Sequence, residues 1–431
     1  MKKIFIILLV IAQNVCFSQQ RLTLPEAITI AIKNSPGIRI VKNNLSISTI
    51  NNDYGIAGGL PAVQITGSDN QQSVSLNQSL SSGTEIQRKG VGSNAAAVGL
   101  GASMPVYAGG RIKTEKKRLE QVQSQVEQEL TSSGLTVVSN VMLRYYDIVR
   151  QQNYAKTIQQ SITVSQQKLN IIQSQKEVGM ANNADLFQAQ LDLNAQKQLL
   201  EAQQLVIDQD KTELLAQLTL KIDSTITIVD TILVDKNIQL DSILNNLYIN
   251  PEVIAADKQV RINELLEREV YGLRYPALSV NTGFNFSKTK SDAGNVLLNQ
   301  SYGPYVGLSF AVPLFNGGIY KKEYKVSTIN TNNARLFKDT LLLGYTSSVV
   351  RTWQSYTSNL RQLDTQQKNY DLSVQLVNLV LQRFQLRQAT IIDLTLAQQT
   401  FQNAAYALVN ISYAAKAAEI QLKKLANRLL F

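Results

Sequence analysis

The sequence predicts an α+β protein built by tandem duplication, in which each copy contributes two β-strands and one long helical hairpin. Landmark residues recur at a constant interval, because Pro105 and Pro313 lie 208 residues apart and so do Asp185 and Asp393. Runs in which apolar residues alternate with small or polar ones precede each of those prolines. Long proline-free stretches with heptad spacing follow, and this spacing is typical of packed helices.

The repeat boundaries follow from these landmarks. We expect a first repeat at 19–220, a connector at 221–237 and a second repeat at 238–431. Each repeat begins with a helix, which reaches about residue 57 in the first copy and about residue 273 in the second. The expected strands are 60–72, 95–107, 276–288 and 303–315; the long helices are 111–177 and 319–385; the tips are 178–185 and 386–393; the return helices are 186–220 and 394–429.

The N-terminus has the pattern of an export signal. Two lysines precede the apolar run 4–12, and Ser18 offers a small residue for cleavage, so we expect a signal peptide at 1–18. The apolar run is too short to span a membrane. Two fates of Cys16 stay open, namely removal with the signal and acylation.

The composition argues against several classes of function. The chain has 42 basic and 32 acidic residues, but its basic residues are scattered, so no nucleic acid partner is expected. It has no histidine and one cysteine. The usual zinc, copper and iron ligands are therefore absent, as is histidine- or cysteine-based nucleophilic machinery. We expect no enzyme, no metal and no cofactor.

The strand-like runs have two interpretations. In the second repeat, Leu278, Val280, Thr282, Phe284 and Phe286 alternate with small or polar residues. This pattern is typical of membrane barrel strands, but a half-buried sheet in a water-soluble sandwich has it too. If the strands cross a membrane, four of them cannot close a barrel, and open strand edges cannot lie in lipid. Several chains would then have to pool their strands.

The long helices also leave two possibilities. Their heptad spacing predicts left-handed supercoiled packing. Their remaining faces are rich in Gln, Asn, Ser and Thr, which suits either the wall of an aqueous channel or an ordinary solvated coiled coil.

Two strand–helix junctions have almost the same sequence, "PVYAGG" and "PLFNGG". In each, a proline ends the strand region and a glycine pair provides backbone freedom for a change of direction. The junction residues are Pro105, Gly109, Gly110, Pro313, Gly317 and Gly318. Basic residues follow each junction and form either a polar collar or a contact surface for anionic lipid head groups. Five aromatic residues either form girdles at the membrane interfaces or are ordinary strand aromatics: Tyr107, Tyr302, Tyr305, Phe310 and Phe315.

The order of elements, the duplication, the two junctions and the tip sequence "VGMANNADLFQAQ" resemble the TolC-type outer membrane efflux protein family. The resemblance covers about residues 21–430. It implies a homotrimer with a 12-stranded barrel in outer membrane lipid, continued by an antiparallel coiled-coil barrel in the periplasm of a Gram-negative bacterium. The connector would lie at the equator of this helical barrel. The implied partners are a periplasmic adaptor (membrane fusion) protein and, through it, an inner-membrane pump or ABC transporter. The implied function is the passive exit duct of a tripartite efflux or type I secretion system.

The resemblance places the two tips at the periplasmic entrance. Asp185 and Asp393 occupy the acidic tip positions of the family, where they either form gating carboxylate rings or cap the helices that follow. Arg387 stands where the first tip has Gly179, which implies either a different turn or a charge that faces the adaptor. The candidate adaptor-docking residues are Gly179, Met180, Ala181, Asn182, Asn183, Arg387, Gln388, Ala389 and Thr390.

An alternative from a different class is a coiled-coil scaffold of the periplasm or cell surface that transports nothing. Solubility distinguishes the two, because a barrel protein requires detergent for extraction and a scaffold does not. The exported substrate is not readable from the residues.

Overall fold

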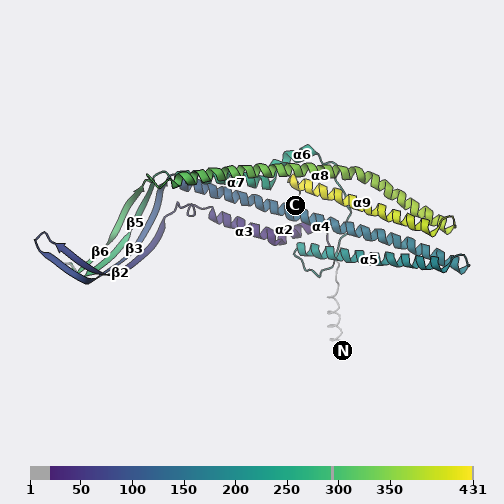
Figure 1. Cartoon of the computed structure of the whole chain (residues 1–431), viewed down its shortest axis with the longest axis horizontal. Coiled ribbons are helices and arrows are strands. Elements are labelled where there is room, and N and C mark those ends of the chain that lie inside the picture. The colour runs from purple at the N-terminus through teal and green to yellow at the C-terminus, as the bar shows by residue number, and fades with distance from the viewer. Residues whose placement is uncertain (1–19, 293–295, 430–431) are drawn as a thin grey trace, which may run out of the picture. The chain divides into compact units, whose positions relative to one another are not determined.

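The computed structural model describes residues 20–292 and 296–429, so the predicted signal peptide and Cys16 lie outside the described residues. The chain forms two compact units, and each is described by itself (Figure 1). The first unit contains residues up to 42, 128–254 and from 340 on; the second contains 43–127 and 255–339.

The helices that open each repeat are divided at a proline. Instead of one helix to residue 57, the chain forms α2 (Leu24–Asn34) and α3 (Pro36–Asn51). The second repeat forms α6 (Leu240–Asn246), the 3₁₀ helix η2 (Leu247–Ile249) and α7 (Pro251–Gly272). Pro36 and Pro251 each begin a helix, because proline lacks the N–H that a helix interior needs but fits its first position.

Two helices of 67 residues dominate the chain, α4 (Arg111–Glu177) and α8 (Ile319–Gln385). Each is followed by a return helix of 35 residues, α5 (Asn183–Gln217) or α9 (Ile391–Leu425). Across the described residues, no helix has both the length and the apolar composition that a membrane span requires.

The duplication is visible in the backbone at the ends of these four helices. Each ends with one residue in the left-handed conformation: Gly179, Thr219, Arg387 and Asn427, with φ between 53° and 73°. The two pairs of positions are 208 residues apart. After α4, the N–H of Met180 donates to Gln175 O at 2.7 Å, and after α8 that of Gln388 donates to Arg383 O at 2.7 Å. Both are the 6→1 bond of a Schellman motif.

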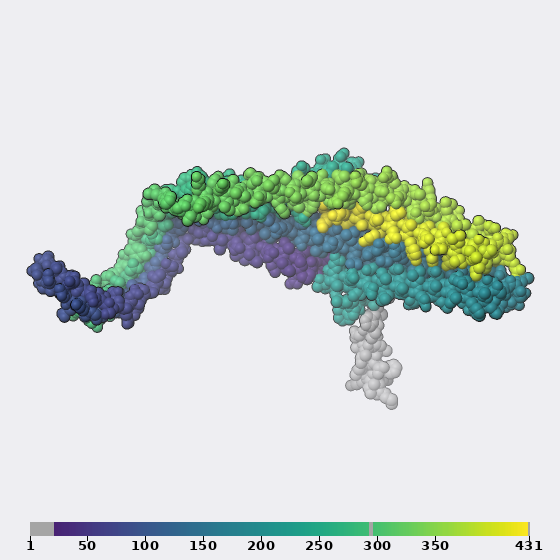
Figure 2. Space-filling view, viewed as in Figure 1, coloured from purple at the N-terminus to yellow at the C-terminus, as the bar shows by residue number. Residues whose placement is uncertain are grey.

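The four long helices of the first unit lie in the order α8, α9, α4, α5. Gln366 on α8 donates to Ala404 O on α9, Gln398 on α9 donates to Ser161 O on α4, and Gln203 on α5 donates to Gln151 O on α4. In the space-filling view, α9 (yellow) lies between α8 (green) and the blue helices (Figure 2). The core between the two hairpins contains equivalent residues of both repeats: Leu169 with Val377, Leu186 with Leu394, Ala189 with Ala397, and Leu193 with Phe401.

The connector packs into the core of the first unit. Its strand β4 (Ile226–Thr227) pairs in parallel with β1 (Gln20–Arg21). Ile226 and Ile228 are buried beside Tyr145, whose hydroxyl donates to Leu22 O at 3.1 Å. Burial and the nearby Asp230 carboxylate raise the pKa of Tyr145 above its ordinary value, so the phenol stays a neutral donor.

The second unit contains one antiparallel sheet in the order β2-β3-β5-β6. The strands are β2 (Ala62–Ser79), β3 (Glu85–Ala108), β5 (Ala277–Ser291) and β6 (Leu298–Ala311). β2 and β3 extend well beyond the expected 60–72 and 95–107, whereas β6 ends four residues before the expected 315. β6 stops at Ala311 because its partner there, Ala277, is the first residue of β5.

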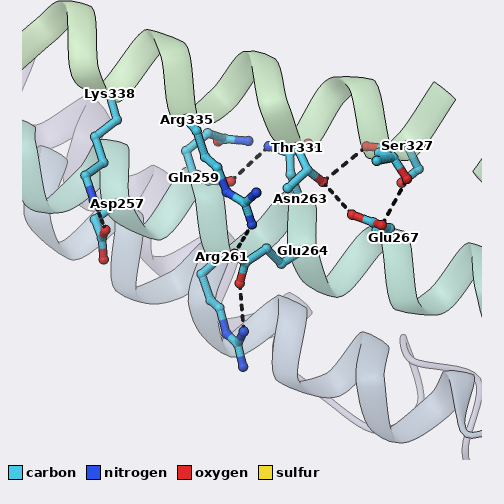
Figure 3. Close-up of polar contacts among 11 residues, drawn as sticks. Asp257, Gln259, Arg261, Asn263, Glu264, Glu267, Ser327, Thr331, Arg335 and Lys338 are labelled. Carbon is cyan, nitrogen blue, oxygen red and sulfur yellow. Dashed lines mark hydrogen bonds and ion pairs between the residues drawn. The ribbon is translucent and has the colours of Figure 1, made fainter. Parts of the chain in front are cut away.

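The helices of the second unit follow the same order as its strands. Lys116 on α4 donates to Asn52, which follows α3, at 2.6 Å, and Arg118 on α4 pairs with Glu269 on α7 at 2.9 Å. A ladder of polar contacts then joins α7 to α8 (Figure 3). Its rungs are Asp257–Lys338 at 2.6 Å, Glu264–Arg335 at 2.8 Å and Glu267–Thr331 at 3.1 Å.

Candidate functional site

One face of the sheet is apolar and exposed. The register aligns apolar residues of all four strands in rows, of which Ile65–Leu100–Phe284–Pro304 is one and Gly67–Val98–Phe286–Tyr302 the next. Val306 is 80 % exposed and Leu308 73 %. An apolar face of this kind on a water-soluble protein would be covered by other elements. Here it forms a band from the Phe310 row to the Tyr302 row of β6. Eight residue steps of about 3.3 Å give about 26 Å along the strand, which fits the apolar band of a barrel.

The opposite face is polar and partly lined by glycine. Its rows include Thr66–Gly99–Asn285–Gly303, and Asn281 donates to Ser309 on this face at 2.6 Å. The two faces together show the apolar-out, polar-in alternation of a barrel strand rather than that of a covered sandwich.

Tyr305 lies on the polar face, so the prediction that it belongs to a lipid-facing girdle is wrong. Its ring covers two glycines, because a Cβ at Gly283 would lie 2.9 Å from the ring and one at Gly101 3.3 Å from its hydroxyl. Tyr305 pairs directly with Gly283, in an arrangement in which an aromatic ring shields glycine in a sheet. Tyr302 and Phe310 do lie on the apolar face, in its end rows.

Both strand–helix junctions use their glycine pairs in the left-handed region. Gly109 and Gly110 have φ of 64° and 75°, and Gly317 and Gly318 have φ of 68° and 75°. At Gly109 a Cβ would also lie 2.3 Å from Gly272 O, so that position excludes any side chain. β3 runs through Pro105 to Ala108, whereas β6 ends two residues before Pro313.

Five lysines beyond the junctions have no ion pair within the described chain: Lys113, Lys117, Lys321, Lys322 and Lys325. Lys116 differs, because it binds Glu120 at 2.9 Å and Asn52. Next to the second group, Leu314 is 92 % exposed and Phe315 89 %. The arrangement suits contact with anionic head groups beside an apolar layer.

The two tips share one turn, so Arg387 does not cause a different one. Arg387 adopts φ of 65° in the position where Gly179 has 73°. Its guanidinium contacts the thioether of Met180, so the two tips meet at this pair. An L-residue in this conformation costs about 1–2 kcal/mol that glycine avoids.

We therefore expect Arg387→Gly to raise the free energy of unfolding by about 1 kcal/mol, because glycine adopts this conformation without strain. Thermal or denaturant unfolding followed by the helical circular dichroism signal measures it. Gly179→Arg is the matched control and should lower stability by a similar amount. A loss of stability in Arg387→Gly would show instead that the contact with Met180 outweighs the backbone strain.

The acidic residues of the two tips have different surroundings. Asn182 caps α5, since its Oδ1 accepts the N–H of Asp185 at 2.8 Å. The carboxylate of Asp185 itself has no hydrogen bond or ion pair within the described chain. Thr390 caps α9 in a capping box, and here the Asp393 carboxylate accepts the N–H of Thr390 at 2.8 Å. The capping alternative thus describes Asp393 but not Asp185.

The hydrogen bond from the Thr390 backbone, followed by that from its hydroxyl, lowers the pKa of the Asp393 carboxyl. A lowered pKa in the folded state means that the cap contributes stability above the unfolded-state pKa of the carboxyl. This contribution is lost as the pH falls through the folded-state pKa. The second tip should therefore loosen only in strong acid.

A buried lysine joins three helices near the tips. Lys168 on α4 is fully buried, and its Nζ donates to Asp192 on α5 at 2.5 Å and to Thr395 on α9 at 3.2 Å. Sequence reasoning missed it, because a lone lysine usually lies on a solvated face. Its signal was the spacing of Ser161, Ser165, Lys168 and Ile172, which places the lysine on a buried helix stripe.

The second unit has unpartnered edges. Within the described chain, no strand pairs with the outer side of β2 or of β6. Exposed apolar residues also lie on the helices at these edges, including Ile47 and Ile50 on α3 and Ile329 and Leu336 on α8. Spacings of three and seven residues place each pair on one helix face.

Comparisons with known proteins agree with this architecture. The model of the outer membrane efflux protein family matches residues 27–219 and 272–428. Outer membrane protein VceC of Vibrio cholerae is 16% identical, with a TM-score of 0.77 over 94% of this chain and 95% of that one. The Campylobacter jejuni outer membrane channel CmeC is also 16% identical, with a TM-score of 0.77 over 94% and 85%.

A curated but uncharacterized protein of Haemophilus influenzae is 23% identical over 296 residues, or 66% of this chain. The match spans only 63% of that relative's length. The two segments matched by the family model correspond to the two repeats of the chain and cover most of it. This chain belongs to the outer membrane efflux protein family.

Proposed function

We propose that three copies of this chain form an exit duct through the outer membrane. Four strands and two open sheet edges cannot exist in lipid, because each unpaired backbone group there costs several kcal/mol. Pairing β6 of one copy with β2 of the next removes both edges, and three copies close a barrel of twelve strands. The resemblance to the efflux protein family implies a homotrimer, which supports this number.

The observation that carries the proposal is the exposed apolar face of a sheet whose other face is polar. In the closed barrel, the rows through Ile65 and Val306 face lipid, and the rows through Asn281 and Asn285 face water. The helices α3, α4, α7 and α8 have the same order as the strands that they adjoin, so the same closure brings α8 of one copy to α3 of the next. The apolar stripes on α3 and α8 then bury each other.

The polar faces of the long helices line the continuation of this duct in the periplasm of a Gram-negative bacterium. The duct conducts passively. Energy enters through an inner-membrane pump or ABC transporter, in tripartite efflux or type I secretion. The tips, residues 179–183 and 387–390, are the surface that the periplasmic adaptor contacts.

The experiment that tests the duct is conductance of the purified, detergent-extracted protein in planar bilayers. We expect discrete conductance steps that require the assembled oligomer. Recovery of the protein in the soluble periplasmic fraction, without any conductance, would instead support the coiled-coil scaffold.

The same preparation tests the tips. We expect Asp185→Asn to shift the reversal potential in a salt gradient toward zero, because three free carboxylates at the entrance raise the local cation concentration. Asp393→Asn should change it less, since that carboxylate is held by the α9 cap. Asp393→Asn should mainly reduce the thermal stability of the helices. Equal shifts in the two variants would contradict the difference in roles.

A further inference from the structure

The β2–β3 hairpin extends far beyond the rest of the sheet. β3 pairs with β5 only from Ser93, opposite Ser291, and the N–H of Asp292 donates to Gly92 O at 3.2 Å. Residues 73–91, here called the distal hairpin, therefore form a two-stranded ribbon beyond the last described pairing with β5. An overhang of this length is not needed to cross a membrane, for which about ten residues per strand suffice.

The polarity of the two faces inverts where the distal hairpin begins. Along β2, the polar face of the sheet reads Gln64, Thr66, Ser68, Asn70 and Gln72, and then changes to Val74 and Leu76. On β3, Val91 pairs with Val74 and Ile86 pairs with Gln78, so they join this face. The face is therefore largely but not wholly apolar, because it also contains Gln78 and Arg88, the partner of Leu76. The face that is apolar in the membrane rows becomes polar, with Ser73, Asn77 and Ser79 on β2.

A β-bulge lies at the base of the distal hairpin. Ser75 faces two residues, Lys89 and Gly90, because the register jumps from Val74–Val91 to Leu76–Arg88. Gly90 has φ of 63°, and its N–H donates to the Ser75 hydroxyl at 3.2 Å. Bulges bend the strand that carries them. In Figure 1 the end of the β2–β3 ribbon turns away from the line of the sheet.

We propose that the distal hairpins of three copies form a lid over the outer mouth of the barrel, with their inverted apolar faces packed against each other at the threefold axis. The proposal rests on the trimeric duct proposed above, in which the polar sheet face points to the axis. Val74, Leu76, Leu80, Ile86 and Val91, which are only half-buried within one chain, then point inward. Arg88 lies on the same face, and its long side chain can keep the guanidinium in water beside the apolar contact. By threefold symmetry, the distal hairpin of the next copy presents the same largely apolar face at the same level along the barrel axis.

The dimensions allow this closure. Twelve strands about 4.8 Å apart and tilted by about 40° close into a barrel with a radius of about 12 Å. The six residue steps from Val74 to Leu80 extend about 20 Å at about 3.3 Å per step. Hairpins that bend inward at the bulge therefore reach the axis. The serine-rich outer face meanwhile remains in contact with water outside the membrane.

Cysteine substitution tests the packing, because Cys16 is the only native cysteine of the sequence. Leu76→Cys should give crosslinked dimers within the assembled trimer after mild oxidation. Asn77→Cys, the next residue on the opposite face, should not. The unsubstituted chain under the same oxidant reports any contribution from Cys16.

Planar-bilayer conductance tests the closure. Leu76→Ser combined with Ile86→Ser should raise the conductance of the trimer severalfold, whereas Asn77→Ser combined with Gln87→Ser, a directly paired control, should leave it unchanged. Equal crosslinking of the two cysteine variants, together with unchanged conductance, would overturn the lid while the trimeric duct stands. The absence of any trimer or conductance in the unsubstituted protein would overturn the duct as well.

Discussion

Lys168→Ala should lower the free energy of unfolding by roughly 3 kcal/mol, because it empties a fully buried position and leaves the partly buried Asp192 carboxylate without its cation. Lys168 is fully buried, and its Nζ lies 2.5 Å from Asp192 Oδ2. The substitution also removes the bond to Thr395 and leaves a cavity where the aliphatic part of the side chain was packed. Denaturant unfolding followed by the helical circular dichroism signal measures the loss.

The control for this prediction replaces both partners. Lys168→Met combined with Asp192→Leu removes the two charges and fills the volume, and such exchanges are often neutral or stabilising. We expect the double variant to recover most of the stability lost in Lys168→Ala. If Lys168→Ala unfolds within about 0.5 kcal/mol of the unsubstituted chain, the buried pair does not hold α4, α5 and α9 together.

Gly283→Ala should prevent or strongly weaken closure of the sheet. A Cβ at this position would lie 2.3 Å from Leu100 O on the neighbouring strand and 2.9 Å from the Tyr305 ring. The carbonyl belongs to the β3–β5 ladder, so it moves only if pairing is disturbed, and overpacking of this kind costs about 1–3 kcal/mol or more in each copy. All three chains of the trimer carry the substitution, so the destabilisation occurs three times in one barrel. The heat resistance of the oligomer on gels should therefore fall clearly.

Gly303→Ala is the matched control. Gly303 lies in the neighbouring row of the same polar face, and a Cβ added there would meet no atom within 4 Å. The oligomer should keep its heat resistance in this variant. Equal loss in both variants would show that glycine is required there for a reason other than the close approach of β3 and Tyr305.

The duplication and the order of elements could be predicted from the sequence because they depend on local signals. Proline is tolerated only in the first turn of a helix, so it marks helix boundaries in the sequence alone. Heptad spacing can likewise be read from one chain without its packing partners. The apolar alternation around Phe284 likewise identified a strand. It could not distinguish a membrane strand from a sandwich strand, since only the register with Leu100 and Pro304 shows that a whole face stays exposed.

The features missed from the sequence depend on long-range pairing. The distal hairpin is rich in serine and glutamine, so its alternation is weak, and its extent is set by pairing of β2 with β3 rather than by strand propensity. Tyr305 was assigned to a girdle because an aromatic residue in a strand suits either face, and only its pairing with Gly283 decides. The capping box of α9 is different, because its signal is local: a threonine at 390 is followed three residues later by an aspartate.

In the proposed assembly this chain contributes one third of a closed twelve-stranded barrel. Native mass spectrometry of the protein extracted in detergent from the outer membrane counts the chains in the assembly directly. We expect three, because three copies turn the four strands of each chain into a barrel without edges. A monomer that keeps its sheet folded, or a dimer, would contradict it.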